Sequence, residues 1–155
     1  MTDRDQASPG EKPPWHAGAY LDQVREALAE KVKGIVVHAT GPRHASIVFT
    51  HPLHDTVVAV DADAATKTGV PSTLTTRVLI SPWNPEDDAA EGILRANASL
   101  RGCALAVAPL DSYPEAVQLV SRHATEATEP SQVLSLIDDV VWEWTAFNQA
   151  AAQGQ

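Results

Sequence analysis

The chain has 155 residues, 44% hydrophobic and 20% charged, which suits one globular domain with its own core. Its formal net charge of −9, without any cluster of Lys and Arg, argues against nucleic acid or an anionic membrane surface as a partner. A single cysteine, Cys103, excludes an internal disulfide, and the sequence shows neither a signal peptide nor a membrane-spanning run, so we expect a cytoplasmic protein.

Three segments are expected: a flexible N-terminal arm (1–14), one domain (15–148) and a flexible tail (149–155). The arm is polar and rich in proline. The domain opens with a helical pattern from Trp15 to Lys33, which Gly34 ends. The apolar residues that share one face of this helix are Tyr20, Leu21, Val24, Leu28 and Val32.

Four strand candidates follow, at residues 34–39, 46–50, 56–61 and 73–81. The first two flank a turn at Thr40–Arg43, which is typical of a hairpin. The last has a period of two, with Leu74, Thr76, Val78 and Ile80 on one side. This alternation predicts a half-exposed strand of an antiparallel sheet.

A central helix is predicted from Pro85, with Asn84 as its cap and the acidic residues 86–88 at the positive end of its dipole. Its apolar face comprises Ala90, Ile93, Leu94, Asn97 and Leu100. Asn97 is polar, and a buried amide must find hydrogen-bond partners. The sequence therefore favours Asn97 as a structural latch between this helix and the sheet over a ligand-binding role.

Two further strands, at 103–108 and 116–121, precede a closing helix at 130–148. The apolar arc of this helix covers about 160°, and Trp142 points away from it. Helices do not alternate regularly with single strands, so a parallel doubly wound sheet is not expected. The predicted fold is α+β: an antiparallel sheet with flanking helices, in the order α-β-β-β(-β)-α-β-β-α.

Catalytic motifs are not apparent, because neither a phosphate-binding loop nor a nucleophile elbow occurs. His44, His51 and His54 lie close in sequence and are weak candidates for a metal site. No carboxylate or thiol pattern completes a tetrahedral set around them, and Asp138 and Asp139 are expected on the solvated side of the closing helix. The sequence therefore predicts no metal, no other cofactor and no enzymatic activity.

Candidate partner-binding residues are Arg77, Leu79 and Trp142. Arg77 and Leu79 lie on the less buried side of their strand, where either a partner or a helix would contact them. Trp142 is either an interface anchor or packs under the N-terminal arm. The wide arc of the closing helix indicates that part of it buries against a second subunit.

The element order and the local sequence resemble the type III secretion chaperone-like superfamily, especially its YbjN-like and actinobacterial branches. The phrase ILRANASL at residues 93–100, the turn at Arg101–Gly102, the strands CALAVAPL and AVQLVSRH, and the acidic helix from Pro130 follow that layout. The resemblance covers most of residues 15–148. It implies a small, acidic, usually dimeric protein that binds unfolded segments of a client protein without a cofactor.

We therefore expect a chaperone-like homodimer that binds proteins, in which a sheet accepts an extended peptide by strand addition. Two alternatives remain open. One is a regulatory adaptor for a single folded partner, and the other is a small metal-dependent protein that uses the histidine loop.

Overall fold

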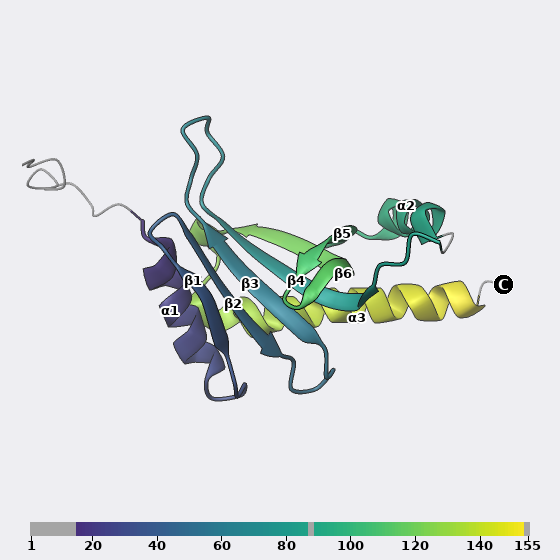
Figure 1. Ribbon diagram of the computed structural model, residues 1–155, viewed down its shortest axis with the longest axis horizontal. Coiled ribbons are helices and arrows are strands. Elements are labelled where there is room, and N and C mark those ends of the chain that lie inside the picture. Colours follow the sequence, from purple (N-terminus) through teal and green to yellow (C-terminus); the bar gives the residue numbers. More distant parts are fainter. Residues whose placement is uncertain (1–14, 87–88, 154–155) are drawn as a thin grey trace, which may run out of the picture.

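The computed structural model describes residues 15–86 and 89–153 (Figure 1). The predicted arm at 1–14 lies outside the described residues, as do Asp87, Asp88 and the last two residues of the predicted tail. The elements in order are α1 (Ala17–Leu28), β1 (Val36–Thr40), β2 (His44–Thr50), β3 (Val57–Asp63), β4 (Thr73–Pro82), α2 (Ala89–Ser99), β5 (Ala104–Leu110), β6 (Tyr113–Ala124) and α3 (Val133–Gln153).

The six strands form one open sheet in the order β1-β2-β3-β4-β6-β5. Every neighbouring pair is antiparallel. The predicted α+β class and order of elements are confirmed, including all four strands before α2.

One face of the sheet forms the core together with α1 and α3, which both pack on it (Figure 1). Side chains of a strand alternate between its two faces, and burial in β4 has that period, whereas Val58–Ala62 of β3 are all buried. The core residues of β2, β3 and β4 include Ile47, Phe49, Val58, Val60, Leu74 and Val78.

The N-terminus of α1 is tied to the β1–β2 turn. The Ala17 and Gly18 N–H groups donate to the carbonyl oxygens of Pro42 and Gly41, at 2.8 and 3.0 Å. A Cβ atom at Gly18 would collide with the Thr40 carbonyl oxygen, so this close approach requires glycine.

Helix α2 departs from its prediction at both the start and the face. It is described from Ala89, whereas Asn84, the predicted cap, accepts from the Glu86 N–H at 3.0 Å before the helix begins. Leu94 is 72% exposed, so the apolar face predicted for α2 is wrong at that residue. The reason is that α2 contacts the core along the side of Ile93, Ala96 and Leu100, and Leu94 lies outside this side.

Helix α3 begins later and ends later than predicted. A 3-10 turn at Pro130–Gln132 precedes it, with a reciprocal capping box between Glu129 and Gln132. The helix continues to Gln153, beyond the predicted end at Asn148. Among the described helices, none combines the length and apolarity that crossing a membrane requires.

Candidate functional site: the open face of the sheet

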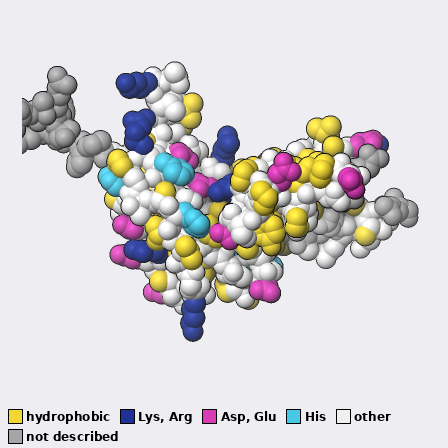
Figure 2. All heavy atoms as spheres, in the orientation of Figure 1, with side chains coloured by type: hydrophobic (Ala, Val, Ile, Leu, Met, Phe, Trp, Pro, Cys, Tyr) yellow, Lys and Arg dark blue, Asp and Glu magenta, His cyan; other side chains and the backbone are white. Residues whose placement is uncertain are grey.

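The face opposite α1 and α3 carries no helix in the part of the chain that the structure describes, and we call it the open face. The strand registers place Ser46, Asp61, Thr75 and Arg122 in one row across it. Figure 2 shows histidine and acidic side chains towards β1–β3 and hydrophobic side chains over β5 and β6. The open face therefore has two chemically different halves.

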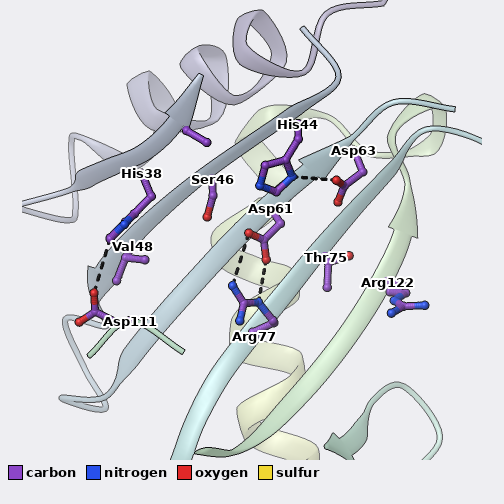
Figure 3. A pocket seen from close by; sticks show the side chains of 11 residues that line it. His38, His44, Ser46, Val48, Asp61, Asp63, Thr75, Arg77, Asp111 and Arg122 are labelled. Atoms are coloured by element: carbon purple, nitrogen blue, oxygen red, sulfur yellow. Dashed lines mark hydrogen bonds and ion pairs between the residues drawn. The ribbon is translucent and has the colours of Figure 1, made fainter. Parts of the chain in front are cut away.

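The first half is a polar hollow of about 580 Å³ over β1–β4 (Figure 3). Two histidine–carboxylate pairs lie in it: His44 Nδ1 is 2.8 Å from Asp63 Oδ1, and His38 Nε2 is 3.5 Å from Asp111 Oδ1. The strand pairing is irregular between Val37 and Ala39, and a bulge of this kind redirects the side chain within it, here His38.

Ser46 also lines this hollow. Among the hydrogen bonds of the described residues, none joins its hydroxyl to a histidine. The contact between nucleophile and base that activates a serine is therefore not formed there. The polar hollow supports ion pairing better than it supports nucleophilic catalysis.

Arg77, a predicted partner-binding residue, is engaged within the chain. Its Nε lies 2.7 Å from Asp61 Oδ2, and its Nη1 donates to the Pro109 carbonyl oxygen at 2.9 Å. Both side chains of the ion pair are largely buried. Arg77 thus fixes the tip of the β5–β6 hairpin to the sheet, while it lines the hollows on both halves of the open face.

Leu79, the second predicted partner-binding residue, packs under that hairpin tip. It contacts a small cluster formed by Ala59, Leu110 and Ala116. Its apolar surface is used within the chain, and the hairpin tip, rather than a helix, is what covers it.

The second half of the open face is a hollow of about 590 Å³, which we call the β5–β6 trough. Its apolar lining is Ala104, Ala106, Ala108 and Val120. Three arginines, Arg77, Arg101 and Arg122, line it too, and none of the described residues that line it is acidic. In a chain of net charge −9, this is a locally positive surface.

Gln118 lies in the trough with an incomplete set of hydrogen bonds. The side chain is 0% exposed, and its Nε2 donates to the Ala108 carbonyl oxygen at 3.0 Å. Because that carbonyl requires a donor, the amide oxygen points the other way. Within the described residues Oε1 has no hydrogen-bond partner. An acceptor without a donor in a buried position is uncommon in folded proteins.

Asn97 links α2 to β5. Its Nδ2 donates to the Leu105 carbonyl oxygen at 3.1 Å, and its Oδ1 accepts from the Leu105 N–H at 2.7 Å. The sequence favours Asn97 as a structural latch between this helix and the sheet, and these two hydrogen bonds form such a contact. The amide also occupies both backbone groups of an edge-strand residue, which are the groups that an added strand would use.

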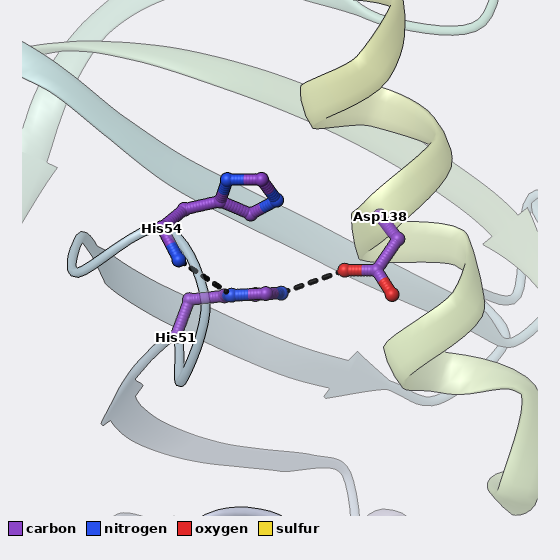
Figure 4. A group of neighbouring side chains, drawn as sticks. All are labelled: His51, His54 and Asp138. Atoms are coloured by element: carbon purple, nitrogen blue, oxygen red, sulfur yellow. Dashed lines mark hydrogen bonds and ion pairs between the residues drawn. The ribbon is translucent and has the colours of Figure 1, made fainter.

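The histidines of the predicted loop separate in the structure. His51 and His54 meet Asp138 of α3, and their ligand atoms lie within 4.8 Å of one another (Figure 4). His44 is on β2, paired with Asp63, so the predicted trio is wrong. Asp138 was expected to be solvated, but its Oδ1 lies 2.7 Å from His51 Nε2 because the β2–β3 loop folds against α3.

The hydrogen bonds of His51 fix its tautomer. Its Nδ1 lies 3.1 and 3.2 Å from the N–H groups of Leu53 and His54, so Nδ1 is the acceptor. The ring proton is then on Nε2, where it is donated to Asp138. A metal at Nε2 would require the proton to move to Nδ1, opposite two donors. The arrangement therefore favours a hydrogen-bonded link between loop and helix over a metal centre.

Trp142 is 72% exposed, in agreement with its predicted position away from the core. It lies at the middle of α3, whose C-terminal half extends past the ends of the strands (Figure 1). Trp144 and Phe147 on the same helix stack with their ring centroids 5.7 Å apart and are only partly buried.

Cys103 is buried beside β5. Burial, followed by the negative charge of Glu143, raises the pKa of its thiol to about 11. The thiol is therefore protonated at neutral pH and is a poor nucleophile.

Sequence reasoning missed the acidic residues of the polar hollow. Asp61 and Asp63 are not among the site residues predicted from the sequence. Their alternation with Val60 and Ala62 along β3 is a signal that places both carboxylates on the face opposite the core. The pairing of Asp138 with His51 had no such signal, because it joins residues 87 positions apart.

Neither a scan against protein-family models nor a search of curated proteins finds a match for this chain.

Proposed function

We propose that this protein is a non-enzymatic, chaperone-like binding protein that holds an extended segment of a client protein on the open face of its sheet. The observation that carries the proposal is the β5–β6 trough, an apolar and solvent-accessible hollow on a sheet face. Apolar hollows with a few polar groups are the usual form of binding sites.

Binding over the face, rather than at an edge, is the mode that the contacts favour. At the β5 edge, Asn97 already occupies the N–H and C=O groups of Leu105. The opposite edge, β1, has five residues, and its pairing is interrupted at His38. Short and bulged edges resist the addition of a strand. This revises the strand addition expected from the sequence.

The resemblance to the type III secretion chaperone-like superfamily and its YbjN-like branch supports the same proposal. It rests on the order of elements and the local sequence, and it implies a homodimer. A cytoplasmic location, expected from the single cysteine, is part of the same proposal. The competing proposal of an adaptor for one folded partner differs in its ligand: an adaptor would bind one intact protein and no isolated extended peptide.

Fluorescence anisotropy with a panel of labelled, unstructured peptides of about eight residues tests this function. Ala106→Phe fills the trough without changing charge and is expected to weaken peptide binding about tenfold or more. Ala39→Phe, a matched change in the polar hollow, is expected to leave it nearly unchanged. A failure of the wild-type protein to bind any peptide would overturn the proposal.

A further inference from the structure

The β5–β6 trough combines three features that together define the chemistry of its ligand: an apolar floor, an arginine border and an unused acceptor. The floor is built from Ala104, Ala106 and Ala108, which leave room for a chain to lie directly on the strand. Small residues alone do not make a site, so the inference depends on the other two features.

The arginine border is the first of these. Arg77 is neutralised by Asp61, but Arg101 and Arg122 form no ion pair with a carboxylate in the described part of the chain. Glu143 lies near Arg101, but its carboxylate accepts from the backbone N–H groups of Arg101 and Gly102, at 2.6 and 3.0 Å. Two guanidinium groups therefore remain available to an anionic ligand, and guanidinium suits carboxylates through paired N–H donors.

The unused acceptor is Gln118 Oε1, which is buried and without a donor in the residues described. Leaving a buried acceptor unpaired costs free energy, and a ligand N–H group would recover it once the neighbouring side chains shift enough to open a path to the oxygen. The N–H groups of an extended peptide are donors of this kind, spaced along the chain every second residue on one side.

We propose that the segment bound in the trough is acidic: its carboxylates pair with Arg101 and Arg122, its small apolar side chains lie on the alanine floor, and a backbone N–H donates to Gln118 Oε1. This inference rests on the proposed function and names its ligand class. The polar hollow sets three carboxylates, those of Asp61, Asp63 and Asp111, against the guanidinium groups of Arg77 and Arg122, so it attracts an acidic segment less than the β5–β6 trough does.

The test compares three labelled peptides of about eight residues that alternate Ala or Val with Glu, Gln or Lys. We expect the Glu peptide to bind at least about fivefold more tightly than the Gln peptide, and the Lys peptide to bind least. Added salt should reduce the preference for Glu over Gln, because the ion pairs at this open surface are screened.

Two double variants with the same change of net charge locate the effect. Arg101→Gln/Arg122→Gln is expected to weaken the Glu peptide about five- to tenfold and to leave the Gln peptide unchanged. Lys33→Gln/Arg43→Gln, on exposed residues outside the trough, is expected to change neither. Gln118→Met, which keeps the side-chain volume, should weaken both peptides. It also removes the donor to the Ala108 carbonyl oxygen, so we expect a lower urea midpoint, and binding is compared without denaturant, where the variant is folded.

The outcomes separate the two proposals. If Glu and Gln peptides bind equally and Ala106→Phe abolishes both, the trough binds segments but the acidic preference is wrong. If the Glu peptide is preferred but the control double variant weakens it as much as Arg101→Gln/Arg122→Gln does, the site is misplaced and this inference fails. If no peptide binds, the proposed function fails as well.

Discussion

His51 shows how a cluster of metal-binding residue types can serve packing. Its side chain is 1% exposed, and both ring nitrogens are used, one as an acceptor of two loop N–H groups and one as a donor to Asp138. The imidazole therefore holds the β2–β3 loop in its turn and attaches that loop to α3.

We predict that His51→Ala lowers the free energy of unfolding by about 2–4 kcal/mol, because it leaves the loop N–H groups and Asp138 without their partner. His54→Ala, on an exposed residue of the same loop, should change it by less than about 0.5 kcal/mol. Urea denaturation measures both. A stabilisation of the wild type by stoichiometric zinc, lost in either variant, would restore the metal-site hypothesis.

Cys103 gives a prediction about pH. Its folded-state pKa of about 11 lies above the ordinary value of 9.0, so the folded protein retains a proton that the unfolded chain releases. The resulting stabilisation is fully present below pH 9.0 and is lost as the pH rises from 9.0 to about 11. Between about pH 8 and pH 10.5, the urea midpoint should therefore fall more for the wild type than for Cys103→Ala. Parallel midpoints across that range would show that the thiol titrates normally.

At the scale of elements, local patterns predicted which side chains of a strand or helix share one face. They failed where contacts with other elements determine which of those side chains are buried. The alternation in β4 placed Leu74, Thr76 and Val78 on the buried face, as observed. In α2 the helical period grouped Leu94 with Leu100, but it does not reveal that α2 contacts the core along a narrower side, formed by Ile93, Ala96 and Leu100. The hydrogen bonds from Asn97 to the backbone of β5 are likewise a contact between elements. Here the sequence did provide a signal, because Asn97 is a polar residue in an apolar helix face.

The link between α2 and β5 leads to a prediction about edge protection. Asn97→Ala leaves the N–H and C=O groups of Leu105 unpaired, which should lower the free energy of unfolding by about 1–3 kcal/mol. It also exposes an edge that other chains can pair with, so we expect self-association that increases with concentration.

Light scattering and urea denaturation together measure these two effects. Asn148→Ala, on the exposed side of α3, is the matched control and should produce neither. Unchanged stability in Asn97→Ala would mean that water satisfies Leu105 as well as the amide does.

At the scale of the whole molecule, the open face could not be predicted from the sequence. Its two halves arise from the register of six strands, which brings residues as distant as Ser46 and Arg122 into one row. The sequence placed Arg77 and Leu79 on the less buried side of β4. What each of them contacts depends on the tip of the β5–β6 hairpin, where Arg77 donates to the Pro109 carbonyl oxygen and Leu79 packs against Leu110.

The C-terminal half of α3, which extends past the ends of the strands, supports the proposed homodimer. From Trp144 to the end of the chain there is no charged side chain, so two strongly acidic chains can approach there with little repulsion. Trp142 is the largest exposed apolar side chain on this helix, and the partly buried pair Trp144–Phe147 continues the apolar surface. Aromatic residues of this kind are the usual energetic anchors of interfaces.

We predict a concentration-dependent dimer by light scattering, and Trp142→Ala should raise its dissociation constant about thirtyfold or more, as expected for an anchor worth about 2 kcal/mol. Leu53→Ala removes a comparably exposed apolar side chain, 80% accessible, from the β2–β3 loop and should leave the dissociation constant unchanged. A monomer at every concentration would remove the dimer from the proposal. Equal dissociation constants for the wild type and Trp142→Ala would keep the dimer and place its interface away from this tryptophan.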